Sequence, residues 1–240
     1  GCAEGTFETL DWGKLGLDRA KFLGGDVTDC GLPTDLYTTV VAYDTTKTKE
    51  PANLFEALFD TAKFPGKRAL QKNPYINLEW ALMADGVAPA DVYTVLGTEE
   101  GVVRAFKKLD TIKKDVIWWE AGAQPPQLLA DGEVAMTTAY NGRIFAAAVA
   151  EGKPFGTVWD GQVYEYDLYV IPKGAPNKDE ALEFVKFATS TQALADQAKW
   201  IAYGPSRKSS AALVGLFNDG KTEMAPYMPT NPDNMKNALG

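Results

Sequence analysis

The side chains best suited to chemistry in this sequence are charged groups set among aromatic ones. Arg143 follows the segment Tyr140-Asn141-Gly142 and precedes an alanine-rich stretch, so we expect it in the first turn of a helix. The free backbone N–H groups of such a turn and a guanidinium both attract anions. Further along the chain, Asp167 lies close to tyrosines and offers the opposite charge. Sites of opposite charge among aromatic side chains suit the binding of a small zwitterion better than a chemical reaction.

The composition argues against most kinds of catalytic or metal site. The 240 residues include no histidine, which is the commonest general base and a common metal ligand. With two cysteines and no histidine, neither a zinc site nor a histidine-dependent triad is expected. No pair of carboxylates stands out as an acid and base. The sequence therefore predicts a binding protein that is not an enzyme, with no cofactor and no metal.

The charge balance also limits the kinds of partner. Lys and Arg total 24 against 32 Asp and Glu, a net charge of −8. A nucleic-acid-binding surface would need a basic face, which this sequence does not provide, and the acidic excess favours solubility. No stretch of 18 consecutive apolar residues is present, so we expect no membrane-spanning helix.

The two cysteines have two possible states. In a reducing compartment Cys2 and Cys30 would be two buried thiols. In an oxidising compartment they would form a disulfide, which we favour because Cys30 lies in a turn-like context before Gly31. A disulfide indicates an exported protein.

Helical patterns alternate with short strand patterns along the chain, which is typical of the α/β class. Strands are expected at 36–43, 68–70, 116–119, before Tyr140, at 155–159 and at 164–171. Helices are expected at 51–63, 77–85, 99–114, 125–130, 144–150, 178–189 and 191–200, the last capped by Ser190. The apolar stripe expected on helix 99–114 is Val102, Val103, Phe106, Leu109 and Ile112. Four tryptophans are expected in the core rather than against a ligand: Trp80, Trp118, Trp119 and Trp200.

Several short motifs occur in a characteristic order along the chain. They are Leu10-Asp11-Trp12, Phe64-Pro65-Gly66-Lys67-Arg68, Ala84-Asp85-Gly86, Asp131-Gly132-Glu133-Val134, Tyr140-Asn141-Gly142, Ile171-Pro172-Lys173-Gly174-Ala175-Pro176-Asn177 and Tyr203-Gly204-Pro205. With these motifs the chain resembles the extracellular solute-binding proteins of ABC transporters, in the spermidine/putrescine-binding branch and its amino-acid-binding relatives. The resemblance covers essentially the whole chain. Family members begin with further strand–helix units, which this chain is expected to lack.

The resemblance implies a two-lobed, type II periplasmic-binding-protein-like α/β fold with an incomplete first lobe, and a ligand held between the lobes. Mapped onto this sequence, lobe one is 1–42 and 167–205, lobe two is 44–165 and 206–240, and the hinge crossings lie near 40–44, 165–167 and 203–205.

The resemblance also implies functional positions. Tyr140 stands where polyamine binders carry a tryptophan that packs on the ligand, and Asp167 stands at the hinge carboxylate that pairs with a ligand amine. Tyr203 matches an aromatic contact near the third crossing. Gln124 and Tyr75 are weaker candidates for ligand contacts. A purely structural explanation stays open for each, as core packing, a loop contact or a surface ion pair.

Two departures from the polyamine-binding pattern change the expected ligand. Polyamine binders have a pair of acids in the segment equivalent to 71–76, and this segment has none. Arg143 stands where they have a small residue. Because guanidinium is well shaped for a carboxylate, we predict a ligand with one amine and one carboxylate, such as γ-aminobutyrate or a similar amino acid. The alternative is a polyamine such as putrescine or spermidine.

The family resemblance also predicts location and partners. It implies a periplasmic monomer that delivers a small molecule to the membrane permease of an ABC transporter. A sensing protein that contacts a receptor instead of a permease is an alternative that the sequence does not separate from transport.

Overall fold

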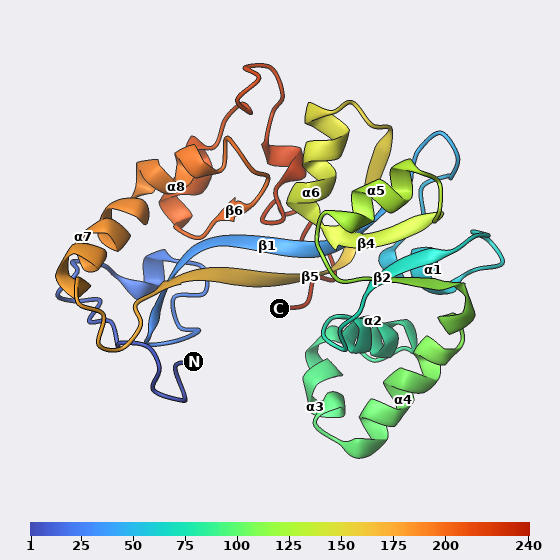
Figure 1. Cartoon of the computed structure of the whole chain (residues 1–240), viewed down its shortest axis with the longest axis horizontal. Coiled ribbons are helices and arrows are strands. Elements are labelled where there is room, and N and C mark those ends of the chain that lie inside the picture. The colour runs from blue at the N-terminus through green and yellow to red at the C-terminus, as the bar shows by residue number, and fades with distance from the viewer. The chain divides into compact units, whose positions relative to one another are not determined.

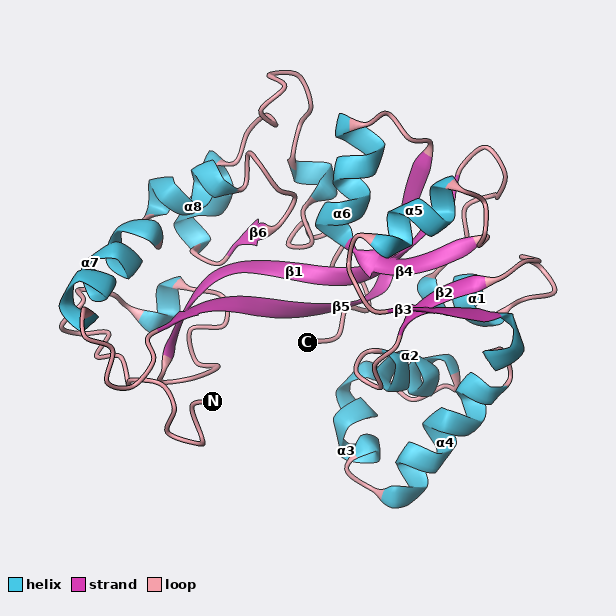
Figure 2. Ribbon diagram, viewed as in Figure 1, coloured by secondary structure: helices cyan, strands magenta, loops and turns pink.

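The computed structural model of this chain describes residues 1–240, which form two compact units. The first unit is Gly1–Tyr37 with Glu165–Thr230, and the second unit is Thr38–Tyr164 with Asn231–Gly240. Two long strands, β1 (Gly31–Asp44) and β5 (Phe155–Val170), contribute residues to both units. Helices and short strands alternate along the chain (Figure 2), which confirms the expected α/β class.

Two segments group differently from the boundaries expected from the sequence. Residues 206–230 were expected in lobe two but belong to the first unit, and residues 38–42, expected in lobe one, belong to the second unit. Hydrogen bonds explain the first difference, because the Ser206 N–H donates to the Thr34 carbonyl at 3.0 Å and the Ser206 hydroxyl donates to the Pro33 carbonyl at 2.6 Å. The Ser210 hydroxyl likewise donates to the Thr191 carbonyl at 2.7 Å. The chain therefore returns to the second unit only after Thr230.

The second unit is built on a sheet in which parallel and antiparallel pairs meet. Three short strands, β2 (Arg68–Gln71), β3 (Val116–Trp119) and β4 (Met136–Tyr140), join β1 and β5 in this sheet. The strand order is β3-β2-β4-β1-β5. β2 runs parallel to both β3 and β4, whereas β4 runs antiparallel to β1. The strands expected at 68–70 and 116–119 are confirmed.

Six helices belong to the second unit. They are α1 (Leu54–Phe59), α2 (Asn77–Ala84), α3 (Val92–Leu96), α4 (Glu99–Asp110), α5 (Gln124–Ala130) and α6 (Asn141–Phe145), and α6 continues as a π-helical turn, Ala146–Ala150. Figure 1 shows α2, α3 and α4 grouped together. The buried Trp80 of α2 lies in the largest core cluster with Leu58, Leu70 and Met136, and its indole N–H donates to the Gly161 carbonyl at 3.0 Å. This apolar core stabilises the second unit.

Helix α4 begins at an N-cap and follows its predicted apolar stripe only in part. The Thr98 hydroxyl accepts a hydrogen bond from the Gly101 N–H at 3.0 Å, which caps the first turn of the helix. A Cβ at Gly101 would lie 1.9 Å from the Val95 carbonyl oxygen, so only glycine fits there. Val103 and Phe106 are exposed, so the predicted stripe is wrong at these two positions. Leu109 and Ile112 pack in the core as predicted, and Ala105 is buried beside them.

The first unit contains two α-helices and a short strand. These are α7 (Lys178–Ala188) and α8 (Thr191–Gln197), and the short strand β6 (Gly204–Pro205) pairs antiparallel with β1. The Ser190 hydroxyl accepts a hydrogen bond from the Ala193 N–H at 3.3 Å, which confirms the predicted N-cap of α8. Leu10, Trp12, Phe22, Leu32, Val185 and Leu194 form the core of this unit.

Strand β5 corrects the expectation of two separate strands at 155–159 and 164–171. It is one continuous strand, Phe155–Val170, and Gly161 lies within it. Gly161 has a φ of +93°, a backbone conformation that glycine adopts far more readily than other residues. Its N–H donates to the Lys236 carbonyl at 3.2 Å within the second unit.

The four tryptophans divide evenly between core and surface. Trp80 and Trp119 are each 1% exposed, so their predicted place in the core is confirmed. Trp118 is 46% exposed and Trp200 is 69% exposed, so the prediction is wrong for these two. Trp118 and Trp119 are consecutive in β3, and consecutive strand residues point to opposite faces of a sheet.

A disulfide joins Cys2 to Cys30 in the first unit, as the sequence predicts. Replacing both cysteines with alanine is expected to lower the free energy of unfolding by about 3–4 kcal/mol, because the unfolded chain is then no longer closed into a loop. Urea titration measures the change. In the presence of a reductant, the wild-type and double-variant proteins should unfold at nearly equal urea concentrations, and a difference that persists there would contradict this explanation.

Candidate functional site

The parallel strands of the second unit end at a common edge of its sheet. Gln71 of β2 lies opposite Trp119 of β3, and β4, which also runs parallel to β2, ends at Tyr140. In α/β sheets, ligands bind outside the carboxyl ends of the parallel strands. The residues that follow these three strand ends are therefore the first candidates for ligand contacts in this unit.

All four of the ligand residues predicted for this part of the chain lie at or after that edge. Tyr75 belongs to the loop after β2, Gln124 begins α5 after β3, and Tyr140 and Arg143 stand at the end of β4 and in α6. Tyr75, Gln124 and Arg143 are exposed, and Tyr140 is half-buried. The sheet topology thus brings together residues that are far apart in sequence.

Tyr140 is held in a defined position by its neighbours. Its ring meets the ring of Trp119 edge to face, with centroids 5.8 Å apart, and its hydroxyl oxygen accepts a hydrogen bond from the Gln71 side-chain amide at 3.2 Å. A Cβ at Gly122 would lie 3.1 Å from the Tyr140 ring, so a larger residue there would press on the tyrosine. A fixed aromatic ring at a strand end is suited to packing against a small ligand.

The asparagine of the Tyr140-Asn141-Gly142 motif has a structural function. Asn141 is buried, and its side-chain oxygen accepts a hydrogen bond from the Thr38 N–H of β1 at 3.2 Å. This contact fixes the first residue of α6 against the sheet. It therefore fixes the direction in which α6 leaves β4, and with it the position of Arg143.

Arg143 is a cation without an ion-pair partner in this structure. It is exposed on α6 and lines a cavity of about 200 Å³ together with α5 residues and the segment before β5. Glu151 and Lys153 line the same cavity, so its charged groups have both signs. Tyr140 does not line this cavity, and the structure therefore does not place the two predicted residues in one pocket. Arg143 is nevertheless available to an anionic group.

Gln124 is largely committed to the loop in which it lies. Its side-chain oxygen accepts hydrogen bonds from the Glu120 N–H at 2.7 Å and the Ala121 N–H at 2.8 Å. These bonds close the turn between β3 and α5. Only the amide NH₂ of Gln124 is left to donate to a ligand, which favours the structural explanation that the sequence left open.

The predicted residues of the first unit are Asp167 on β5 and Tyr203 just before β6. The ring centroids of Tyr203 and Tyr37 lie 5.6 Å apart, so the two tyrosines form an aromatic pair. The side chain of Asp167 is exposed and makes no hydrogen bond or ion pair, yet partial loss of water around it raises the pKa of its carboxyl. The Asp167 carbonyl accepts a hydrogen bond from the Thr34 hydroxyl at 3.2 Å, which ties β5 to β1.

The sequence prediction missed Asp35, a buried acid of the same unit. Burial, and after it the negative charge of Asp167, raises the pKa of Asp35 to about 6, although hydrogen bonds from Thr34 and Gln197 act in the opposite direction. The sequence signal for this residue was a single carboxylate within the otherwise uncharged, β-forming segment 32–43. A charge in such a segment is costly unless it has a function or a partner.

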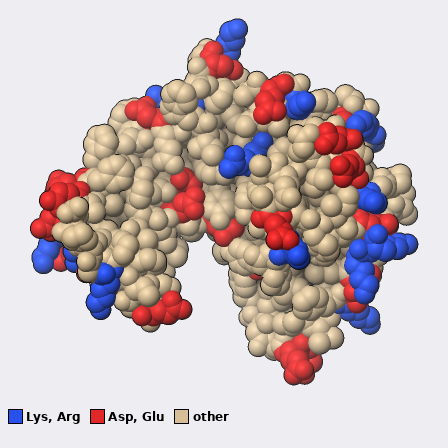
Figure 3. Space-filling model, viewed as in Figure 1, with Lys and Arg blue, Asp and Glu red and all other residues tan.

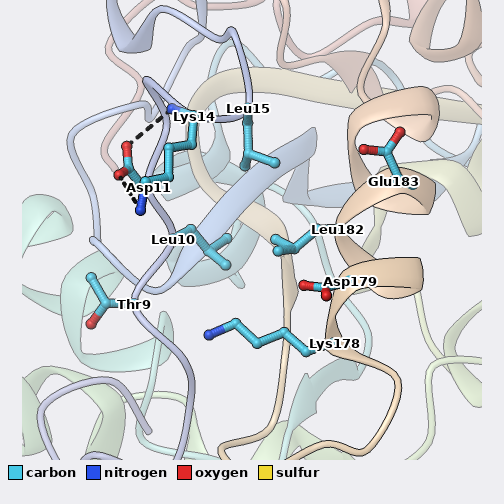
Figure 4. A pocket seen from close by; sticks show the side chains of 9 residues that line it. All are labelled: Thr9, Leu10, Asp11, Lys14, Leu15, Lys178, Asp179, Leu182 and Glu183. Carbon is cyan, nitrogen blue, oxygen red and sulfur yellow. Dashed lines mark hydrogen bonds and ion pairs between the residues drawn. The ribbon is translucent and has the colours of Figure 1, made fainter.

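A groove of about 480 Å³ in the first unit lies away from all of these residues. It runs between the segment Thr9–Leu15 and helix α7, with Leu10, Leu15 and Leu182 between charged side chains (Figure 4). Its Asp11 and Lys14 form an ion pair with each other. It includes none of the predicted ligand residues.

The whole chain contains no group of three or more His, Cys, Asp or Glu placed to hold a metal ion. None of its helices has the length and apolar character needed to cross a membrane. Acidic and basic side chains are mixed on the face shown in Figure 3, and no extended basic area appears there.

Comparisons with known proteins give consistent matches over nearly the whole chain. Residues 3–230 match the family model described as bacterial extracellular solute-binding protein. The gamma-aminobutyric acid-binding protein of Pseudomonas aeruginosa is 44% identical over 238 residues, a match that covers 99% of this chain and 65% of that protein. The chain thus spans less than two thirds of this relative's length.

Two solved structures are similar at moderate sequence identity. The PBP MotA from A. tumefaciens, in complex with glucopine, has a TM-score of 0.85 and 32% identity, and the match covers 99% of this chain and 72% of that one. The Atu4243-GABA receptor has a TM-score of 0.82 and 35% identity, and the match covers 99% of this chain and 70% of that one.

The adjacent tryptophans of β3 provide a matched test of how the sheet edge is built. Trp119→Ala is expected to lower the free energy of unfolding by about 3–5 kcal/mol, because it empties a buried site and removes the contact with Tyr140. Trp118→Ala removes the same side chain from the exposed face and should cost less than about 1 kcal/mol. Thermal or urea unfolding measures both changes. Equal losses in the two variants would contradict this assignment of faces.

Proposed function

We propose a small zwitterionic amino acid as the ligand of this chain, which belongs to the family of bacterial extracellular solute-binding proteins. The matches to solved binding proteins confirm the type II periplasmic-binding-protein-like fold predicted from the sequence. The ligand that fits the charged residues best is γ-aminobutyrate or a similar amino acid. The observation that carries this proposal is the unpaired guanidinium of Arg143 beyond the carboxyl edge of the sheet.

The second unit is suited to the carboxylate end of such a ligand. Arg143 has no acidic partner, so its guanidinium remains free to donate two parallel hydrogen bonds to a carboxylate. The ordered side chain of Tyr140 precedes it at the end of β4, where it offers an apolar ring and a hydroxyl.

The first unit is suited to the ammonium end. Asp167 supplies a carboxylate that no side chain of the protein neutralises, and Tyr37 and Tyr203 supply aromatic rings in the same unit. Carboxylates attract ammonium groups directly, and aromatic faces add a weaker attraction for the same cation.

A polyamine fits the second unit less well. A diamine needs an anion at each end, because a buried ammonium without a partner costs several kcal/mol. The loop after β2 contains no acid, and the nearby Glu120 already pairs with Lys72 at 2.9 Å. Putrescine or spermidine therefore remains the second candidate.

The names of two relatives support the same ligand class. The Pseudomonas aeruginosa relative is named for gamma-aminobutyric acid, and one of the similar solved structures is named as a GABA receptor. We propose the same ligand class for this chain.

We place the protein in the periplasm as a monomeric receptor that delivers its ligand to the membrane permease of an ABC transporter. Membership of an extracellular solute-binding family supports this location. The disulfide supports it as well, because such bonds persist in oxidising compartments. Closure around the ligand would be the signal that the permease recognises.

The ligand assignment is tested by isothermal titration calorimetry with γ-aminobutyrate and putrescine at pH 7.5. We expect γ-aminobutyrate to bind at least about tenfold more tightly, because only it presents a carboxylate to Arg143. Tighter binding of putrescine would overturn the assignment in favour of a polyamine.

The residue assignment is tested by Arg143→Met, which keeps an unbranched apolar side chain and removes the charge. The loss of charge-assisted hydrogen bonds should weaken γ-aminobutyrate binding by about 10–100-fold. Arg104→Met is the matched control, because Arg104 lies on α4 and already pairs with Asp85 at 2.6 Å. An unchanged affinity in Arg143→Met, or an equal loss in both variants, would reject Arg143 as the carboxylate partner.

A further inference from the structure

Asp35 combines features that no structural need of the first unit explains. Its side chain is only 5% exposed, and one carboxylate oxygen, Oδ1, has no hydrogen-bond partner. The other oxygen, Oδ2, accepts hydrogen bonds from the Thr34 hydroxyl at 3.0 Å and the Gln197 amide at 2.8 Å. A buried carboxylate that is only half satisfied destabilises a fold. Such a group suggests a function for which the free oxygen or the charge is needed.

The surroundings of Asp35 are those of an amine site. Asp35 and Tyr37 lie two residues apart on β1 and therefore point to the same face of the strand. The Tyr37 ring contacts the ring of Tyr203, and Asp35 lies opposite Pro205 in the pairing of β1 with β6. The hydroxyl of Thr34 joins the Asp35 carboxylate to the backbone of Asp167. The first unit thus places Asp35 and Tyr37 on one face of β1, with Tyr203 against Tyr37 and the backbone of Asp167 held by Thr34.

The charged groups around Asp35 leave it without a cation. Asp167 on β5 is the charged side chain whose field reaches it, and its sign is the same. Helix α8 presents the neutral Gln197, while its Asp196 and Lys199 pair with each other at 2.6 Å. The tyrosines are neutral at physiological pH. An acid exposed to the field of a second acid, with no cation nearby, favours either a bound proton or a bound cationic ligand.

We propose that Asp35 is a specificity-determining residue that acts with Asp167 on the ammonium group of the ligand, and that binding of this group releases a proton held by the two acids. This proposal rests on the amine-bearing ligand proposed above. In the free protein at acidic pH the Asp35 carboxyl holds the proton, and Asp167 carries the negative charge. When the ammonium group arrives, the Asp35 O–H bond breaks and the proton passes to the buffer, leaving two carboxylates near one cation.

The direction of the pH effect follows from this exchange. Burial and the charge of Asp167 raise the pKa of Asp35 to about 6 in the free protein. A bound cation favours the carboxylate and lowers that pKa, so binding below pH 6 must expel a proton, whereas binding well above pH 6 need not. Affinity should therefore rise by up to about tenfold between pH 5 and pH 7 and level off above that. γ-Aminobutyrate remains zwitterionic over this range, so the ligand does not contribute the change.

The test compares the wild-type protein with Asp35→Asn by titration calorimetry with γ-aminobutyrate from pH 5 to pH 8. Each pH is measured in two buffers of different ionisation enthalpy, which reports the protons released on binding. Asparagine is isosteric, and its amide oxygen can accept the bonds from Thr34 and Gln197. We expect the wild-type protein to release protons near pH 5.5, and Asp35→Asn to bind more weakly at pH 7.5, to release none and to lose the pH dependence.

Asp26→Asn is the matched control, because Asp26 is an exposed acid of the same unit and the substitution changes the net charge equally. It should retain both the affinity and the proton release of the wild-type protein. Identical pH profiles in wild type and Asp35→Asn would overturn the proposal while leaving the ligand assignment intact. Absence of γ-aminobutyrate binding by the wild-type protein at every pH would instead reject the proposed function.

A stability measurement keeps the test decisive even if Asp35→Asn binds no ligand. A carboxyl whose pKa is higher in the folded than in the unfolded state makes the folded state less stable as pH rises through the interval between the two values. The melting temperature of the ligand-free wild-type protein should therefore carry a component that falls from about pH 4 to pH 6. Asp35→Asn should fold and lack this component. If the variant shows the same pH dependence as wild type, Asp35 does not hold the proton.

Discussion

Removing a charged group from water costs several kcal/mol unless an opposite charge meets it, and this constraint determines what the two units can bind. Several charged side chains of this protein satisfy it by pairing with each other, as Arg104 does with Asp85 and Lys72 with Glu120. Arg143 and Asp167 have no such partner. The proposed zwitterionic ligand carries a charge complementary to each of them.

The fold fixes these two charges by strand pairing and by hydrogen bonds of neighbouring residues rather than by contacts with the charged groups themselves. In the second unit, parallel strands end together, and the hydrogen bond from Thr38 to Asn141 sets the start of the helix that carries Arg143. In the first unit, the hydroxyl of Thr34 ties Asp167 to β1. The side chains themselves stay free to contact a ligand, which is what a receptor requires.

The sequence was sufficient where a local signal decides the structure. Ser190 caps α8 as its position predicts, and the β-branched and aromatic run of β3 is a strand. It was insufficient where the outcome depends on distant residues. Alternation along β3 places Trp118 and Trp119 on opposite faces of the sheet, but it does not show which face is buried. Asp35 was missed because Gln197, which holds its carboxylate, lies 162 residues away in sequence.

Removing the carboxylate from the ligand tests the role of Arg143 most directly. Calorimetry would compare γ-aminobutyrate with n-butylamine, which lacks the carboxylate, in wild type and Arg143→Met. We expect wild type to bind γ-aminobutyrate more tightly than n-butylamine. We also expect Arg143→Met to abolish this preference while its affinity for n-butylamine stays within about twofold of wild type. An equal loss of affinity for both ligands, or a preference that survives in Arg143→Met, would contradict the assignment of Arg143 as the carboxylate partner.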